Sequence, residues 1–526
     1  MSLIITLAGR RSSTRRERRR SAPAHERRHP IIAILAALSL ELALSGMAGA
    51  ATGSGWIEVR NPHFVVISNA LPPEARQVAE RFERVRAVFE KAFPTMREYP
   101  GLPIRVFAAS GQASFEALEP AAWQQSGEIA HAGMLLRNAD RAYILLRLGL
   151  PGDNPYRVVY HEYAHLMLGE NFPSIPLWLN EGLSEFYSDS DLDRKTVWLG
   201  LPSRQDLTLL RAQPLLPLQA LFAAGASSPY YNERGKGTIF YAESWALVDY
   251  LMFLKTDPAT GRGPIDNYLQ LIAEGAEPVA AGARAFGDLT RLQNTLAAFV
   301  QRRQFHYYRL KVNQRRPKSP FSVIELNPAD AAAIRGDFLV RVGREAEARS
   351  LLTQALQADP GLAGAQQGMG LLEMRQHHPA LAQGWFDKAA SASPRAYLAR
   401  YYQALAMMRS PSAAEMEQRI TSDVNALLSV NPAYAPADAA LAYFYARLRN
   451  HLDRARQLAA RASQLDPHNV DYKMLEADIL LAQSNAAAAL KVAQQAIAQA
   501  QTPAEKSRAY VLLGTIQARA AARQGR

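Results

Sequence analysis

Two histidines four residues apart give this sequence its clearest indication of chemistry. His161, Glu162 and His165 form the pattern His-Glu-x-x-His. On a helix the two imidazoles would lie one turn apart on the same face, where both can reach one metal ion at roughly 2.0–2.1 Å. Glu162 would then lie near enough to the remaining coordination position to take a proton from a bound water. The pattern predicts half of a catalytic zinc site.

The segment around the histidines has the features of a helix. Asn154 and Pro155 supply an N-cap and a first-turn proline, and Gly169 is a suitable end. Its apolar side would consist of Val158, Val159, Leu166 and Leu168. The competing interpretation is that the two histidines are solvated residues on a helix surface.

A catalytic zinc needs a third protein ligand, and a second helical segment follows after a short loop. This segment reads Trp178-Leu179-Asn180-Glu181-Gly182-Leu183-Ser184-Glu185. We predict Glu181 as the third ligand. Glu185 lies one turn further on the same face, where it could accept the outward N–H of a ligating histidine. For Glu185, an ordinary exposed charge is the competing interpretation.

Together these motifs resemble the gluzincin metallopeptidases, the class of thermolysin and the zinc aminopeptidases, in which the Glu of Asn-Glu is the third zinc ligand. The chain is more similar still to the bacterial peptidase MA-like family, whose members often carry tetratricopeptide repeats. The segments that carry this second resemblance are 56–59, 63–66, 154–160 and 241–245. The resemblance implies a thermolysin-like α+β domain that binds Zn²⁺ through His161, His165 and Glu181.

Tyr241 is the candidate for stabilising an oxyanion. Apolar residues at helical spacing follow it, so the sequence predicts that its hydroxyl lies at the start of a helix. The segment is similar to the Tyr-Glu-Lys-Gly helix of the zinc aminopeptidases, which implies an oxyanion-stabilising role for Tyr241, although Ser244 replaces the family glycine. Tyr230 and Tyr231 compete for the role, and core packing is the alternative for Tyr241.

Other candidate residues have structural interpretations. His63 and His131 lie in apolar, strand-like contexts and are expected to be structural rather than metal-binding. Trp178 and Trp245 are expected in the core. The element with which the aminopeptidases hold a free amine, Gly-x-Met-Glu-Asn, is absent, because the comparable stretch from Gly133 to Asn138 lacks a glutamate. An endopeptidase is therefore expected.

The first fifty residues resemble an export signal. They carry an arginine-rich stretch and an apolar run from Ile31 to Leu44, interrupted by Glu41, with a small-residue cleavage site at 48–50. We expect cleavage near Ala50 and a periplasmic or secreted protein. The alternative is retention of the segment as an inner-membrane anchor, and this alone would give the protein a membrane partner.

Composition excludes several classes of function. The chain has no cysteine, which removes a thiol nucleophile and a cysteine-rich zinc finger, so the metal must use histidine and carboxylate ligands. The formal charge is +12, of which residues 1–50 account for +6. Because the rest is only mildly basic and carries no interleaved basic and aromatic stripe, no nucleic-acid partner is expected.

The C-terminal part of the chain repeats. Prolines at 360, 394, 432 and 467 recur close to the tetratricopeptide period of about 34 residues, and small residues such as Gly336, Ala348 and Ala355 fall where that motif packs its two helices. The unit that ends at Pro432 departs from the pattern, with Ile420 and Leu427 at small positions and a short insertion. A fifth unit is displaced. A generic alanine-rich helical bundle is the competing interpretation.

The sequence thus predicts a signal peptide over 1–50, a zinc peptidase domain over 51–313, a linker over 314–320 and an all-α tetratricopeptide solenoid over 321–526. In the expected mechanism, zinc and Glu162 activate water for attack on a peptide carbonyl, Tyr241 and zinc hold the oxyanion, and Glu162 returns the proton to the amine. The expected partners are a peptide or protein substrate and a protein bound by the repeats. The alternative is a non-catalytic repeat scaffold with a peptidase-like, peptide-binding domain.

Overall fold

The structure is a computed structural model of the whole chain. It describes residues 13–16, 55–93, 96, 102–126, 133–138, 140–149, 156–172, 174–192, 196–225, 228–232, 236–254, 256, 262–311, 321–393, 396–467, 469–500 and 503–524. Most of the predicted leader and the whole linker at 314–320 lie outside these residues. Among the described helices, none is long and apolar enough to cross a membrane.

A six-stranded mixed sheet forms the centre of the N-terminal region. Its strand order is β10-β2-β3-β4-β6-β5, with β3, β4 and β6 parallel and the other pairs antiparallel. The strands are β2 (Ile57–Arg60), β3 (Phe64–Ser68), β4 (Ile104–Ala109), β5 (Gly133–Arg137), β6 (Ala142–Arg147) and β10 (Ser322–Glu325). β5 lies at one edge, so one side of its backbone has no strand partner within this sheet.

Helices cover both faces of this sheet. Neighbouring residues of a strand point to opposite sides, so apolar residues on both faces need a helix layer to bury them. Val66 and Val106 belong to the core that includes helix α1 (Pro72–Ala92). Phe107 belongs to a second core on the other face, where it stacks on Phe338 with ring centroids 4.3 Å apart. The two short helices α2 (Gln112–Glu116) and α3 (Ala121–Ser126) follow β4.

A second, antiparallel sheet has the strand order β1-β9-β8-β7. Its strands are β1 (Ser13–Arg16), β7 (Asp191–Leu192), β8 (Thr196–Leu199) and β9 (Gln304–Lys311). β1 belongs to the predicted leader and pairs with β9. Cleavage near Ala50 would therefore remove this strand from the edge of the sheet.

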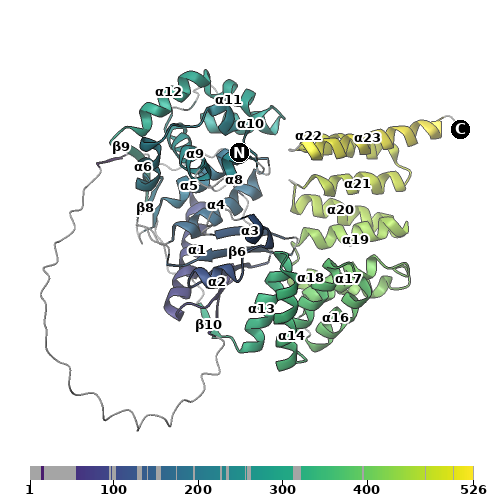
Figure 1. Ribbon diagram of the computed structural model, residues 1–526. Coiled ribbons are helices and arrows are strands. Elements are labelled where there is room, and N and C mark those ends of the chain that lie inside the picture. The colour runs from purple at the N-terminus through teal and green to yellow at the C-terminus, as the bar shows by residue number, and fades with distance from the viewer. Residues whose placement is uncertain are drawn as a thin grey trace, which may run out of the picture.

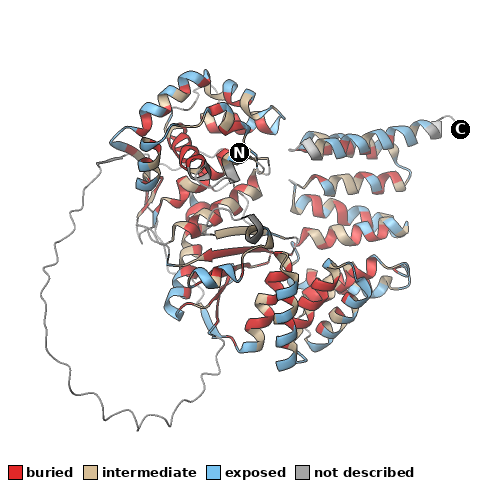
Figure 2. Ribbon diagram, in the orientation of Figure 1, coloured by how far each residue is buried: buried red, intermediate tan, exposed pale blue. Residues whose placement is uncertain are grey.

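Helices dominate the remainder of the N-terminal region. They are α4 (Arg157–Asn171), α5 (Leu177–Ser188), α6 (Arg204–Ala212), α7 (Leu218–Ala223), α8 (Pro229–Asn232), α9 (Lys236–Met252), α10 (Pro264–Ala273), α11 (Pro278–Phe286) and α12 (Leu289–Val300). Figure 2 shows α9 as a largely buried helix at the centre of this group. The region therefore combines a mixed sheet with a helical layer.

The C-terminal region is a solenoid of antiparallel helix pairs, stacked side by side in Figure 1. The pairs are α13 (Pro328–Arg341) with α14 (Glu345–Ala358), α15 (Ala363–Arg375) with α16 (Pro379–Ala392), α17 (Tyr397–Met408) with α18 (Glu417–Val430), α19 (Ala435–Leu448) with α20 (Leu452–Leu465), and α21 (Val470–Ala482) with α22 (Ala486–Gln499). Helix α23 (Pro503–Gln524) follows the last pair. The prediction of an all-α solenoid of helix pairs is confirmed.

Small residues let the helices of each pair approach closely. A Cβ atom on Gly336 would lie 2.8 Å from Cγ of Leu352, and Ala348 and Ala355 are fully buried. In the third pair, Ile420 and Leu427 are buried at the equivalent positions, and a longer turn between Arg409 and Met416 takes up the insertion.

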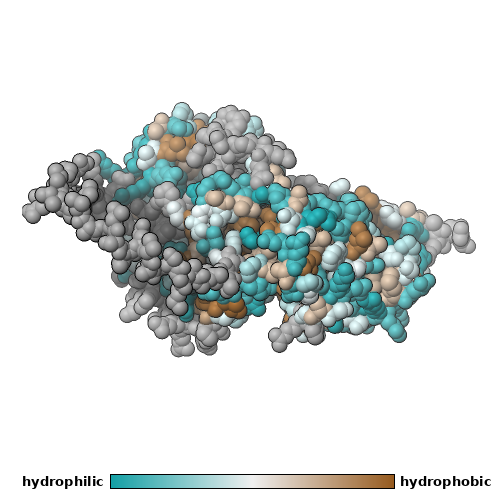
Figure 3. All heavy atoms as spheres, turned by 60° about the horizontal axis from the view of Figure 1, so that its bottom comes forward, coloured by the Kyte–Doolittle hydropathy of each residue, from teal (hydrophilic) through white to brown (hydrophobic). Residues whose placement is uncertain are grey.

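The face drawn in Figure 3 is mainly hydrophilic, with hydrophobic side chains in separate patches.

The boundary between the two regions is less sharp than the sequence indicates. β10, which follows the predicted linker, completes the six-stranded sheet beside β2. α13 then covers one face of the sheet, where Arg341 donates to Asp140 at 2.9 Å and pairs with Asp337 at 3.1 Å. The first repeat is therefore part of the core of the N-terminal region.

Candidate metal centre

The two histidines lie on α4, which begins at Arg157 and ends at Asn171. The predicted cap residues Asn154 and Pro155 lie outside the described residues. The helix does not stop at Gly169 as predicted but continues for two residues, and the Asn171 side chain donates to the Met167 carbonyl at 2.8 Å. On this helix the His161 and His165 rings are nearly perpendicular, with an interplanar angle of 83° and centroids 4.5 Å apart.

Glu181 on α5 completes a group of three ligand atoms. Its Oε2 lies 3.6 Å from His161 Nε2 and 3.3 Å from His165 Nε2, and the two imidazole nitrogens are 2.9 Å apart. Side chains from two helices therefore converge on one point.

This triangle fits a zinc ion. Two donors at about 2.0–2.2 Å from a tetrahedral ion lie roughly 3.3–3.6 Å from each other, and both Glu181 distances fall in that range. Only the two imidazole nitrogens would have to separate, by roughly 0.5 Å. Two neutral nitrogen donors and one carboxylate are also a donor set that suits zinc.

The electrostatics of the three residues favour a bound cation. Burial opposes protonation of His165, but the adjacent Glu181 carboxylate outweighs it and raises the pKa of His165 to about 9. Burial likewise opposes ionisation of Glu181, yet His165 and His161 lower the pKa of that carboxyl group below its ordinary value. A metal ion bound here would compete with a proton for His165.

Glu162 lies in the same site and is 5% exposed. Burial raises its pKa, although His161 and His165 act in the opposite direction. Its Oε1 would be 2.8 Å from a Cβ atom on Gly133, which brings Glu162 against the first residue of the edge strand β5. A carboxylate with a raised pKa beside the edge strand β5 is suited to accepting and returning a proton.

The outward nitrogens of both histidines have polar neighbours. Glu185 Oε1 lies 3.5 Å from His161 Nδ1, and Ser184 Oγ lies 3.0 Å from His165 Nδ1. Glu185 is well shielded rather than an exposed charge, and Arg157 lowers its pKa although burial acts to raise it. Such partners fix the orientation of ligating imidazoles.

Tyr241 does not lie at a helix start, because α9 already begins at Lys236. The phenol is partly buried on the second turn of the helix. It precedes Ser244 by three residues and so shares a side of α9 with it. The Ser244 carbonyl contacts Gly182, the neighbour of Glu181, so this side of α9 packs on the helix that carries the third ligand.

None of the other candidate residues that the structure describes belongs to the group of His161, His165 and Glu181. Tyr230 packs partly buried against the N-terminal core, and the side chain of Tyr231 lies outside the described residues, as does His131. His63 forms a 2.7 Å contact with Glu83, which accords with a structural role. Trp178 and Trp245 are fully buried, as expected.

Sequence reasoning missed several residues of the site. Gly133 reaches it only through packing between segments distant in the chain, and sequence spacing carries no such signal. Ser184 follows Glu181 by three residues on α5, so helical spacing could have placed it on the same side. Arg157 was missed although it lies one turn before His161, a spacing that could have drawn attention to it. It pairs with Glu185, Asp189 and Asp206.

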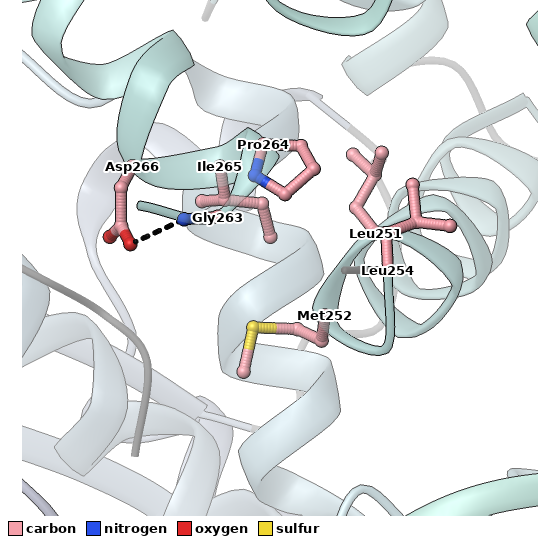
Figure 4. A pocket seen from close by; sticks show the side chains of 7 residues that line it. All are labelled: Leu251, Met252, Leu254, Gly263, Pro264, Ile265 and Asp266. Carbon is pink, nitrogen blue, oxygen red and sulfur yellow. Dashed lines mark hydrogen bonds between the residues drawn. The ribbon is translucent and has the colours of Figure 1, made fainter. Parts of the chain in front are cut away.

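A small hollow lies elsewhere, between the end of α9 and the start of α10 (Figure 4). Its lining is mostly apolar, and the carboxylate of Asp266 accepts from the Gly263 amide at 3.2 Å. It contains none of the residues of the metal centre. The hollow offers no second set of catalytic groups.

Comparison with known proteins finds repeat structures. No family model and no curated protein matches the chain. Similar solved structures include YrrB, a TPR protein with an unusual peptide-binding site, at 19% identity and a TM-score of 0.30, covering 35% of this chain and 91% of that one. MamA is similar at 18% identity and a TM-score of 0.28, over 31% and 93%. PilF of Pseudomonas aeruginosa is similar at 13% identity and a TM-score of 0.30, over 36% and 88%. Each similarity covers only about a third of this chain.

Proposed function

We propose that this protein is a zinc-dependent peptidase of the gluzincin type, with a thermolysin-like domain, and that its repeat region recruits a protein or peptide. The observation that supports the proposal is the triangle of His161 Nε2, His165 Nε2 and Glu181 Oε2, with buried Glu162 near the two histidines and against the edge strand β5. Zinc, when bound, would supply a Lewis acid for the scissile carbonyl and for water.

The chain's own residues would move the protons. Glu162 takes a proton from the attacking water while the water oxygen bonds to the carbonyl carbon, and it then gives that proton to the amide nitrogen as the C–N bond breaks. The hydroxyl of Tyr241 donates to the carbonyl oxygen as negative charge develops there. His161, His165 and Glu181 hold their positions throughout.

β5 is the element that would align the substrate. An extended peptide can add to the open edge of a sheet through main-chain hydrogen bonds. Because Gly133 at the start of β5 lies against Glu162, a peptide on this edge would pass the proposed base. The strand contains no glutamate to hold a free amine, which supports an endopeptidase.

Metal content and hydrolysis of a mixed peptide library test this proposal. Purified protein should contain about one zinc per chain and cleave library peptides internally, and a chelator should abolish cleavage. His161→Ala, His165→Ala and Glu181→Ala should each lower zinc occupancy. A wild-type chain that stays metal-free when zinc is resupplied at neutral pH would contradict the proposal.

A non-catalytic repeat scaffold is the second candidate. The helix pairs from α13 to α22 are visible in the structure itself, and solenoids of this kind present extended binding surfaces. This reading has the better support at present, because no comparison supports the peptidase reaction. The library test separates the two, since a scaffold would bind peptides without cleaving them.

We also propose export through the arginine-rich leader, with a periplasmic or secreted mature protein. The support is the sequence pattern of residues 1–50, of which the structure describes only β1. The N-terminal residue of the protein recovered from its native cell identifies the outcome. A mature start near Ala51 supports cleavage, whereas an intact leader in the membrane fraction supports an anchor.

A further inference from the structure

Arg157 gathers three carboxylates beside the metal centre. It is the first residue of α4 and lies one turn before His161, on the same side of the helix. Its guanidinium donates to Glu185 of α5, to Asp206 Oδ2 of α6 at 3.1 Å, and to Ser188 Oγ at 3.2 Å. Asp189 Oδ1 lies 3.5 Å from its Nε. One side chain therefore joins three consecutive helices.

The contacts of Glu185 are divided between its two oxygens. Oε2 accepts from Arg157 and lies 3.1 Å from Ser188 Oγ, which leaves Oε1 directed at His161 Nδ1, 3.5 Å away. Because Arg157 holds one oxygen, the other oxygen has a fixed place relative to the histidine. A guanidinium with several donors can impose this orientation, whereas a point charge cannot.

Glu185, Asp189 and Asp206 together could suggest a second metal site, since one ligand atom from each lies within 4.8 Å of the others. The Arg157 guanidinium already contacts all three carboxylates and supplies the positive charge that a cation would bring. The cluster is therefore better explained as the support of Arg157 than as a metal site.

We propose that Arg157 is a positioning residue of the metal centre. Through Glu185 it fixes the His161 ring, so that Nδ1–H points to the carboxylate and Nε2 presents its lone pair to the metal. Asp189 and Asp206 hold the guanidinium in place. This inference rests on the metal site of the proposed function but not on its peptidase activity.

The test is zinc affinity of the full-length protein, measured by competition with a chelator. Arg157→Met should weaken binding by roughly 10–100-fold, the usual effect of losing an outer partner of a metal ligand. Arg157→Lys keeps the positive charge but lacks the several N–H donors of the guanidinium. Its zinc affinity should therefore lie between those of Arg157→Met and wild type. Arg81→Met is the matched control, because Arg81 also binds the start of α4, through the Tyr160 hydroxyl, and should leave zinc affinity unchanged.

A double-mutant cycle separates positioning from a merely structural role. If Arg157 acts through Glu185, adding Arg157→Met to Glu185→Gln should weaken zinc binding no further. Wild-type affinity in Arg157→Met, or two fully additive effects, would overturn the proposal while leaving the metal site intact. Should Arg157→Met fail to fold, wild-type affinity in Arg157→Lys overturns it instead. A wild-type chain that binds no zinc would overturn this proposal together with the metal site.

Discussion

At the scale of single residues, burial decides how the polar side chains of the N-terminal region behave. Glu162, Glu181 and Glu243 are all at most 5% exposed, yet their neighbours differ. Glu181 lies beside two imidazoles and has a lowered pKa, whereas burial without an adjacent cation raises the pKa of Glu243 to about 8. The neighbouring groups therefore explain why Glu181 stays ionised and can bind a cation, whereas Glu243 tends to keep its proton.

The hydroxyl of Tyr241 can be tested without disturbing the metal. Tyr241→Phe should keep zinc and fold, but kcat should fall by roughly 10²–10³-fold if the phenol donates to the developing oxyanion. Metal content and peptide turnover are measured together, with Tyr230→Phe as the matched control. Unchanged turnover in Tyr241→Phe combined with a loss in Tyr230→Phe would transfer the role to Tyr230.

Glu243 should make stability depend on pH. Its folded pKa of about 8 lies above the ordinary value of 4.5, so its contribution is fully present below pH 4.5 and is lost as pH rises through 8. Glu243→Gln can keep the contact with the Leu216 amide, 2.6 Å long in wild type, and cannot ionise. Relative to wild type, this variant should therefore gain stability as pH rises, by up to about 1.4 kcal/mol per pH unit.

Thermal unfolding at pH 5, 7 and 9 measures this difference. Glu90→Gln, at an exposed carboxylate on α1, is the control and should follow the wild-type pH profile. Parallel curves for Glu243→Gln and wild type would show that Glu243 keeps its charge in the folded protein.

At the scale of elements, the close approach of α5 and α9 positions Glu181, the proposed third ligand. Gly182 makes this possible, since a Cβ atom there would meet the Ser244 backbone carbonyl and, at 2.8 Å, Cγ2 of Val248. A backbone atom cannot move aside as a flexible side chain can. α5 therefore depends on a glycine directly after Glu181.

Gly182→Ala should accordingly destabilise the protein by about 1–3 kcal/mol, as overpacking does. It should also weaken zinc binding, because Glu181 moves with α5. Gly384→Ala is the matched control, as it lies in helix α16 with open space around its Cα and should be neutral or stabilising by about 0.5–1 kcal/mol. Equal thermal midpoints for Gly182→Ala and wild type would contradict the close approach.

The elements also show what the sequence could predict. The spacing of His161 and His165 is local to one helix, so their shared face followed from periodicity alone, as did the helix pairs of the repeats. The start of α9 was misplaced because Tyr241 follows earlier helical residues that lack an apolar pattern. The contact of Gly133 with Glu162 depends on how β5 packs on α4, which periodicity cannot reveal.

At the scale of the whole molecule, the first repeat and the mixed sheet share one core. Phe338 of α13 is fully buried between Phe107 and Tyr143, with which its ring centroids are 4.3 and 5.8 Å apart. The sequence predicted the repeats but placed a linker before them, because a shared face between a helix and a distant sheet leaves no local signal. The first repeat is therefore packed directly against the mixed sheet.

Phe338→Ala should destabilise both the mixed sheet and the first repeat. Loss of a buried phenylalanine typically costs about 3–5 kcal/mol, and here the cavity would open between α13 and the sheet. Hydrogen exchange should then rise in β4 and β6 as well as in α13. Tyr443→Ala, at an exposed tyrosine of α19, should change neither. Faster exchange confined to α13 would show that the repeats fold independently of the sheet.

Glu162 is the residue on which the proposed peptide hydrolysis depends most, because it is proposed to act as the base. Glu162→Gln keeps the shape of the side chain and leaves His161, His165 and Glu181 intact. Zinc content and turnover of a peptide found in the library test are measured side by side for this variant and for wild type, with Glu90→Gln as the control. We expect wild-type zinc content with turnover lowered about 10²–10⁴-fold. Wild-type turnover in zinc-loaded Glu162→Gln would contradict this role of Glu162.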